Sequence, residues 1–131
     1  MLASLTHGDG VDDVVWMARK IASLRLFGDA VTSNPQSVAE LGAAVLAISQ
    51  FTLVADCRKG RRPSYDRAMA SAPARALFER LVGRPAVEIA TVATGTFGTT
   101  MHVRLVNDGP YTLVIESPAR DRCDERHGSE F

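Results

Sequence analysis

Asn107-Asp108-Gly109-Pro110-Tyr111-Thr112 separates two apolar runs, residues 101–106 and 113–115, in the last third of the chain. Asp-Gly and Gly-Pro side by side are strong turn signals, and Gly tolerates backbone angles that other residues avoid. Pro readily accepts a cis peptide bond, although only about 5% of X-Pro bonds in folded proteins are cis. The stretch alone therefore favours an ordinary trans turn. It leaves open a rigid prong that presents main-chain carbonyls.

Length and composition bound the class of protein. At 131 residues the chain is about one domain, and its 46% hydrophobic content is typical of a folded protein. Fifteen basic and fifteen acidic residues cancel, so the overall charge requires neither a nucleic acid nor a membrane as partner. Cys57 and Cys123 indicate no disulfide framework and no metal-type spacing. With no membrane-length apolar run and no secretory signal, a cytoplasmic location is expected.

Hydrophobic periodicity predicts two amphipathic helices, over residues 11–23 and 73–82. The run Ala44 to Ile48 is continuously apolar, which suits a strand buried on both faces. From Ser117 onward the chain is charged and nearly free of large apolar residues, which predicts one domain over 1–116 and a disordered tail over 117–131. Residues 37–42 are ambiguous and suit one helical turn. Strand-like stretches cover residues 1–6, 24–27, 43–53, 87–94, 101–105 and 112–115.

The chain shows no familiar catalytic constellation. His7, His102 and His127 stand apart, and no Ser/His/Asp, Cys/His or metal-ligand set is indicated. We therefore expect no metal and no cofactor. An enzyme built on this chain would work with main-chain groups, hydroxyls, amides and the substrate itself.

Two short segments carry polar or aromatic residues with two possible roles. Ser49-Gln50 interrupts the apolar run of 43–53, and such groups at the end of a buried strand either find partners in the protein or serve a ligand. Phe97 lies in the glycine-bracketed turn 95–98, where it is either a pocket wall or an aromatic ring packed over the turn. The residues alone leave both questions open.

Residues 56–67 hold the one charge cluster that stands out. Its five basic residues face only two acidic ones, Asp56 and Asp66, and Gly60 lets the loop bend. A basic loop just after a central strand is a plausible site for a phosphate backbone, which it would position without reading sequence. A solvated basic loop is the alternative. The basic residues are Arg58, Lys59, Arg61, Arg62 and Arg67.

Several segments, taken in order, resemble the D-aminoacyl-tRNA deacylase (D-tyrosyl-tRNA deacylase) family. Ser49-Gln50-Phe51-Thr52-Leu53 is similar to the family's SQxxL segment, and residues 107–112 to its NxPxT segment, which contains Gly-Pro. The basic loop 56–64 and the segment Thr94 to Gly98, followed by Met101, lie between them. Either motif alone is weak, but both in order are highly specific, and the resemblance runs from about residue 2 to residue 116.

The resemblance implies an α/β (α+β-like) fold with mixed, largely antiparallel sheets and two helices. It implies a homodimer in which the Gly109-Pro110 bond is cis and each prong helps build the partner's pocket. The implied reaction is hydrolysis of the ester that joins a D-amino acid, or glycine, to the 3′ end of a tRNA.

The resemblance also assigns roles to residues. Gly109 and Pro110, with Asn107, would select chirality, because two rigid carbonyls can hold the α-ammonium group and leave no room for an L side chain. The oxyanion would be supported by Ser49, Gln50 and the amides of Phe51 and Thr52. Phe97 and Met101 would line the adenosine pocket. The tRNA acceptor stem would meet Arg58, Lys59, Arg61 and Arg62.

The family offers two accounts of the attacking step, and this chain departs from the family pattern in places. Thr112 resembles a residue proposed as nucleophile, whereas another view gives the activating role to the ribose 2′-hydroxyl of the tRNA. The lack of a base near Thr112 in the sequence favours the second view. Members usually begin earlier, with a two-stranded hairpin, and Val54, Cys57 and Thr99 replace commoner residues. The alternative function is a non-catalytic RNA-binding or inactive remnant of the family.

Overall fold

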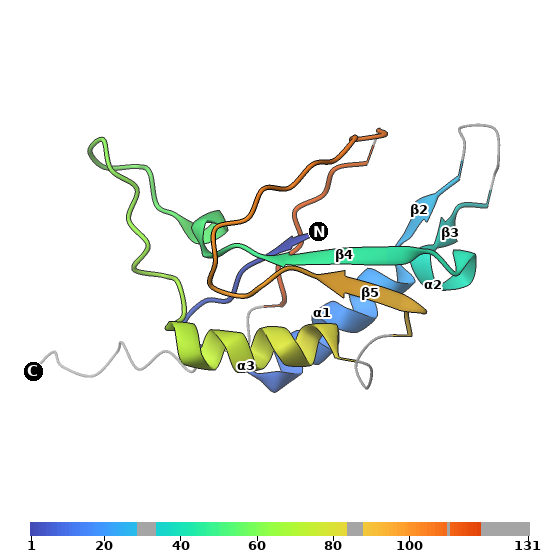
Figure 1. The fold of residues 1–131 in the computed structure, drawn as a ribbon, viewed down its shortest axis with the longest axis horizontal. Coiled ribbons are helices and arrows are strands. Elements are labelled where there is room, and N and C mark those ends of the chain that lie inside the picture. Colours follow the sequence, from blue (N-terminus) through green and yellow to red (C-terminus); the bar gives the residue numbers. More distant parts are fainter. Residues whose placement is uncertain (29–33, 84–87, 110, 119–131) are drawn as a thin grey trace, which may run out of the picture.

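The computed structural model describes residues 1–28, 34–83, 88–109 and 111–118. A three-stranded sheet in the order β1-β4-β5 forms its centre, made of Leu2–Ala3, Ala44–Ser49 and Thr91–Thr94. Two helices, α1 (Val11–Ser23) and α3 (Ser71–Val82), lie together against one face of this sheet (Figure 1).

Smaller elements complete the described chain. Strand β2 (Arg25–Phe27) pairs with β3 (Gln36–Ser37) in a second, antiparallel sheet, and helix α2 (Val38–Leu41) follows directly. A 3-10 turn, η1 (Phe51–Val54), comes just after β4. The predicted single helical turn is α2, and the helix predicted over 11–23 is α1 with the same bounds. The second helix begins at Ser71 rather than at Pro73.

The mixed α/β class is confirmed, but the central sheet is parallel rather than largely antiparallel. Leu2 lies opposite Ile48 and Ala44 opposite Thr91, each in a parallel pair. The reason is connectivity, because a helix-containing segment separates β1 from β4 and another separates β4 from β5, and such crossovers return the chain in the same direction. In the described residues, antiparallel pairing is limited to β2–β3 and to two isolated bridges.

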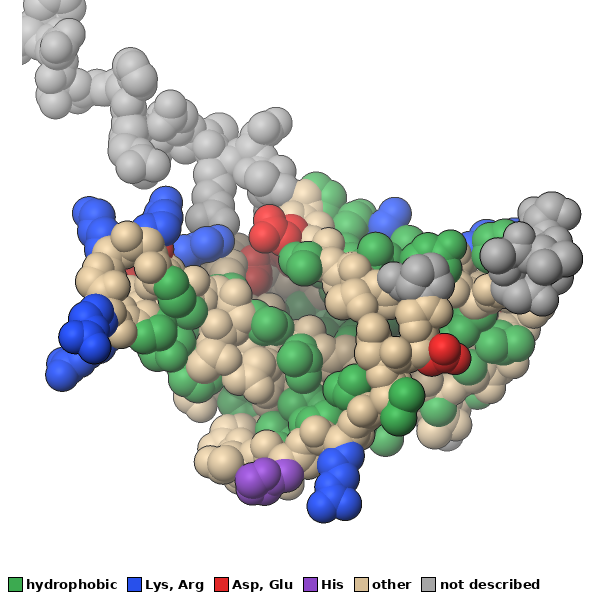
Figure 2. All heavy atoms as spheres, turned by 90° about the horizontal axis from the view of Figure 1, so that it is seen from above, with side chains coloured by type: hydrophobic (Ala, Val, Ile, Leu, Met, Phe, Trp, Pro, Cys, Tyr) green, Lys and Arg blue, Asp and Glu red, His purple; other side chains and the backbone are tan. Residues whose placement is uncertain are grey.

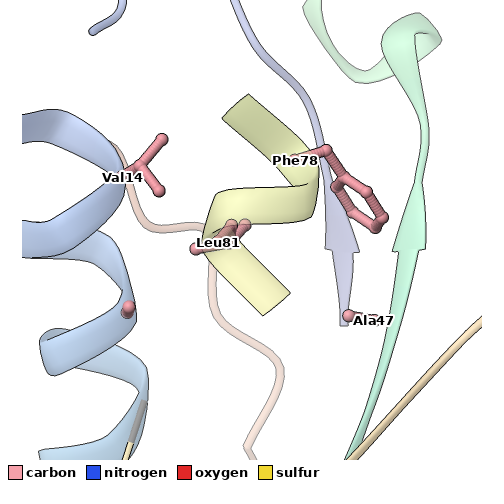
Figure 3. Close-up of a cluster of buried hydrophobic side chains, with 5 residues drawn as sticks. Val14, Ala47, Phe78 and Leu81 are labelled. Atoms are coloured by element: carbon pink, nitrogen blue, oxygen red, sulfur yellow. The ribbon is translucent and has the colours of Figure 1, made fainter. Parts of the chain in front are cut away.

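The main core lies between the two long helices and the sheet. Its buried members are Val14 and Ala18 of α1, Ala47 of β4, and Phe78 and Leu81 of α3. Figure 3 shows Phe78 and Leu81 projecting from α3 between α1 and β4. A second buried cluster of Ala22, Val38 and Ile89 ties α1 to α2 and to the segment before β5.

The apolar run of β4 predicted a strand buried on both faces along its length, and the structure shows otherwise. Ala47 and Ile48 are buried, but Leu46 is 47% exposed. Ala47 packs against the helices, so Leu46 and Ile48 share the opposite face, and on that face burial reaches Ile48 but not Leu46. The strand also ends at Ser49 rather than Leu53, because residues 51–54 turn into η1.

The strands predicted over 101–105 and 112–115 are not formed. In Figure 1 the two segments run out to the prong as irregular chain, and within 88–109 and 111–118 the last strand is β5. A strand needs a neighbour to complete its hydrogen-bond ladder, and residues 101–109 and 111–118 make no main-chain hydrogen bond to the rest of the described chain. Apolar side chains here are therefore exposed, including Val106 at 92%.

Several sequence predictions fall outside the described residues. These are the tail beyond residue 118, most of the loop expected over 28–37, the segment 84–87 with Val87, and Pro110 with its peptide bond. In the part of the chain that the structure describes, no helix is long and apolar enough to cross a membrane.

Helix α2 depends on a capping box that gives a first testable prediction. The Ser37 hydroxyl accepts a hydrogen bond from Glu40 N–H at 3.1 Å, and the Glu40 carboxylate accepts one from Ser37 N–H at 2.8 Å. We expect Ser37→Ala to lower the free energy of unfolding by about 1 kcal/mol, measured by urea denaturation. Ser23→Ala, at the exposed end of α1, is the control. Equal midpoints for Ser37→Ala and the natural chain would contradict the role of the cap.

Candidate functional site

The first part of the candidate site is the corner where β4 ends, residues 49–52. Gln50 N–H donates to Ala3 O at 2.7 Å, which ties the corner to β1. The Gln50 side-chain amide donates to the Thr52 hydroxyl, so the two polar side chains hold each other. The first N–H groups of a helical turn have no acceptor within it, and η1 begins at Phe51. The amides of Phe51 and Thr52 are therefore available to an incoming oxygen.

The second part is the prong, residues 107–112. The Thr112 hydroxyl donates to Asn107 Oδ1 at 3.4 Å, which links its two sides, and both residues are exposed. A Cβ added to Gly109 would meet no atom within 4 Å, so its surroundings in this chain are open. Among the described residues, no hydrogen bond joins the prong to residues 49–52, and Figure 1 shows the prong projecting away from that corner. The structure does not bring these two parts of the predicted site together within one chain.

The third part is the turn that holds Phe97. The Phe97 ring packs against Phe78, with 5.8 Å between ring centroids, and the Arg75 guanidinium lies 5.1 Å from its centroid. Arg75 Nη2 also donates to Phe97 O at 3.4 Å. Both partners come from α3, so the Phe97 ring packs against this helix, and its role in a pocket stays a prediction. Thr99, which departs from the family pattern, donates its hydroxyl to Thr96 O at 2.9 Å.

Met101 lies against the end of β4. A Cβ built on Gly95 would lie 2.3 Å from Met101 Sδ and 3.4 Å from the Ile48 side chain, so the absence of a side chain at Gly95 makes room for the thioether. Ile48 immediately precedes Ser49. The structure thus brings Met101, but not the prong, to the neighbourhood of the corner.

The fourth part is the basic loop, residues 56–64, which projects from one end of the molecule. Asp56 and Ser64 exchange both main-chain hydrogen bonds, at 2.8 and 2.9 Å, and Gly60 turns the tip with a φ of 69°. Asp56 accepts hydrogen bonds from the Arg58 main chain at 2.9 Å and from its guanidinium at 2.8 and 3.0 Å. These bonds hold the pKa of the Asp56 carboxyl well below its usual range, so Asp56 is ionised at neutral pH.

The remaining cations of the loop are not neutralised by the protein. Lys59, Arg61 and Arg62 are exposed, and within the described chain none of them forms an ion pair or a hydrogen bond. Figure 2 shows Lys and Arg side chains gathered at this end of the molecule, beside a hollow in the same face. Of the four predicted tRNA contacts, Arg58 is engaged by Asp56 and three are available.

Sequence reasoning missed two residues of this region. Arg75 holds the Phe97 turn, and a signal was present, since Arg75 and Phe78 are three apart on a helix and share a face. Tyr65 lies beside the basic loop and contacts Phe51, and its adjacency to the charge cluster was the available signal. The described residues include no group of three His, Cys, Asp or Glu side chains that could hold a metal ion.

The comparisons with known proteins agree with this architecture. The chain is similar to the D-aminoacyl-tRNA deacylase of Halalkalibacterium halodurans, with 47% identity over 117 residues, or 89% of this chain and 80% of the relative. It is 44% identical to the D-aminoacyl-tRNA deacylase of Acaryochloris marina over 119 residues, or 91% and 79% of the two chains.

Two solved structures share the fold. The c-Myc DNA unwinding element binding protein matches with a TM-score of 0.76 and 32% identity, over 90% of this chain and 80% of that one. A probable eukaryotic D-amino acid tRNA deacylase matches with a TM-score of 0.68 over 83% and 79%, and at 16% identity it is evidence for the fold alone.

The fold and the corner define a mixed α/β protein with main-chain amides available to a ligand at the end of its central strand. A sequence model described as D-Tyr-tRNA(Tyr) deacylase matches residues 1–116, and the chain belongs to this family. The resemblance based on the two motifs is thereby confirmed.

Proposed function

We propose that this protein hydrolyses the ester of D-aminoacyl-tRNA, releasing the free D-amino acid and the tRNA. The observation that carries the proposal is the family match over residues 1–116, which includes both the corner and the prong. Relatives named D-aminoacyl-tRNA deacylase share 44–47% identity with it over nine tenths of the chain. Glycyl-tRNA is a second candidate substrate, because glycine also lacks an L side chain. Aminoacylated tRNA is used in the cytoplasm, which is the location we propose.

In the proposed reaction, the oxygen of a water molecule adds to the ester carbonyl carbon as the water loses a proton, and the bond from that carbon to the ribose 3′ oxygen then breaks. The amides of Phe51 and Thr52 stabilise the charge that develops on the carbonyl oxygen, supported by Ser49 and by the Gln50–Thr52 side-chain pair. The leaving ribose oxygen takes up a proton, and water supplies the hydroxyl of the released acid. Main-chain donors suit this role because they need no change of ionisation.

We propose that the complete site is formed by two copies of the chain. The corner and the prong are not in contact within one chain, and the prong carries exposed apolar side chains that an isolated chain would leave in water. A partner's prong placed against the corner would bring the carbonyls of Gly109 and Pro110 to the substrate's α-ammonium group. An L side chain would then meet the prong backbone, so selection works by exclusion.

Turnover of D-tyrosyl-tRNA against L-tyrosyl-tRNA tests the function. With enzyme far below substrate, we expect repeated turnover of the D-ester only. A folded protein that binds tRNA but cleaves neither ester would instead support the non-catalytic alternative.

Gly109→Ala tests the prong separately. The added methyl meets nothing within 4 Å in its own chain, so the fold should be unaffected. We expect the ratio of D- to L-ester turnover to fall by about tenfold, because one methyl group in a close-fitting site changes discrimination by that order. Thermal unfolding is the control for stability. An unchanged ratio would show that the prong does not select chirality.

A further inference from the structure

Two aromatic side chains form an exposed pair next to the candidate site. The rings of Phe51 and Tyr65 meet edge to face, with 5.1 Å between centroids and an interplanar angle of 68°. Phe51 is 56% exposed and Tyr65 is 40% exposed, although aromatic rings are usually placed where they bury most of their surface. The pair is therefore fixed in geometry yet open to solvent, which is suited to stacking against a planar ligand.

The position of the pair links the ester site to the basic loop. Phe51 belongs to the corner, where its main-chain amide is available, while Tyr65 follows Ser64, which closes the loop by its double hydrogen bond to Asp56. A polymer that crossed the pair would thus have one end at the corner and its next units at Lys59, Arg61 and Arg62. We call this set of two rings and three cations the aromatic-basic patch.

The charges of the patch identify an anionic polymer as the ligand. Of the two nearby carboxylates, Asp56 is paired with Arg58 and Asp66 accepts a hydrogen bond from the Ser64 hydroxyl at 2.7 Å, and neither forms an ion pair with the three cations of the patch. The three cations of the patch have no such partner within the described chain. Cations beside exposed aromatic rings are the combination that binds single-stranded nucleic acid, because phosphates meet the charges and unpaired bases stack on the rings. Paired bases in a stem would leave the rings unused.

We propose that the aromatic-basic patch binds the unpaired nucleotides at the 3′ end of the tRNA, with at least one base stacked on Tyr65 or Phe51. This inference rests on the proposed function for the identity of the RNA. It assigns the side chain of Phe51 a role separate from that of its amide, and it assigns Tyr65 a role in binding. Stacking there would hold the chain end so that the ester reaches the corner.

The test compares two RNA hairpins with the same stem, one with a short unpaired 3′ overhang and one blunt, by fluorescence anisotropy with the full chain. We expect Tyr65→Leu to weaken binding of the overhang hairpin by about tenfold and to leave the blunt hairpin unchanged, since one stacked base contributes about 1–3 kcal/mol. Phe51→Leu, which keeps the amide, should act in the same direction. Tyr65→Phe keeps the aromatic face and should retain the natural affinity.

Phe27→Leu is the matched control, because Phe27 is a comparably exposed aromatic residue on β2, away from the patch. Equal losses for both hairpins, no loss for the overhang hairpin, or an equal loss with Phe27→Leu would each overturn the proposal. A change of oligomeric state on Tyr65→Leu without a change in overhang binding would overturn it too, by assigning the rings to a subunit interface. The hairpins carry no amino acid, so binding and hydrolysis are measured separately. A preference for the overhang without ester hydrolysis would contradict only the proposed function. Hydrolysis without that preference would contradict only the proposed role of the aromatic-basic patch.

Discussion

A D-aminoacyl-tRNA whose terminal ribose lacks the 2′-hydroxyl is expected to be hydrolysed about 10²–10⁴-fold more slowly than the natural substrate. Thr112→Val, in contrast, is expected to reduce turnover of the natural substrate by less than about tenfold. A threonine hydroxyl is a weak nucleophile unless a neighbouring base removes its proton. The contact that Thr112 makes is with the amide oxygen of Asn107, which is not such a base.

The environment of Thr112 supports the same expectation. The residue is exposed, and the described chain places no histidine or carboxylate in hydrogen-bond contact with its hydroxyl. The 2′-hydroxyl of the substrate, by comparison, is held next to the ester by covalent geometry, which gives it a large advantage in effective concentration. We therefore propose that the 2′-hydroxyl of the substrate supplies the activation and that Thr112 is not the nucleophile.

Single-turnover assays measure the hydrolysis rates of the natural and the 2′-deoxy substrate by the natural protein and by Thr112→Val. Binding of the deoxy substrate, measured separately, controls for lost affinity. Fast cleavage of the deoxy substrate together with an inactive Thr112→Val protein would reverse the assignment and make Thr112 the nucleophile.

The sequence predicted those elements whose structure depends on local pattern. Helix α1 has the predicted bounds because its apolar residues repeat at helical spacing and bury one face against the core. The alternating pattern of 101–105 is equally regular, yet no strand forms there, because a strand also requires a hydrogen-bonding neighbour that local sequence does not specify. For the same reason, the direction of pairing in the central sheet depended on connectivity rather than on composition.

In the candidate site, too, the features set by local sequence were predictable and those set by contacts between distant residues were not. The corner was predictable because an apolar run ends in Ser49-Gln50, and the structure places these residues at the end of β4. The basic loop was predictable as a charge cluster. The sequence did not predict that Asp56 would bind Arg58 and leave the other cations of the loop available. The contacts of Arg75 with Phe97 and of Tyr65 with Phe51 join residues far apart in sequence, so only the fold reveals them. The meeting of corner and prong, which we propose to require a second chain, cannot be read from the sequence of one chain.

Phe78→Ala is expected to lower the free energy of unfolding by about 3–5 kcal/mol, the largest stability effect we predict. Phe78 is 5% exposed, and it packs in the cluster that joins α1, α3 and β4. Truncation removes the buried ring and leaves a cavity that the packed helices and β4 cannot close completely. Since small domains have a total stability of about 5–15 kcal/mol, a considerable part of the population would unfold at moderate temperature.

The same substitution connects the core to the candidate site, because Phe78 is one of the two α3 residues that hold Phe97. Urea unfolding of Phe78→Ala and of Phe27→Ala, whose ring is 41% exposed, separates the loss of a core residue from the loss of any phenyl ring. We expect the Phe27 variant to lose much less stability, since the cost of truncation depends on buried surface and on the cavity left behind. Equal losses of unfolding free energy in the two variants would mean that the main core between the helices and the sheet is not the main source of stability. If Phe97 lines the proposed adenosine pocket, Phe78→Leu should recover most of the stability but not the affinity for the terminal adenosine, because the Phe78 ring holds Phe97.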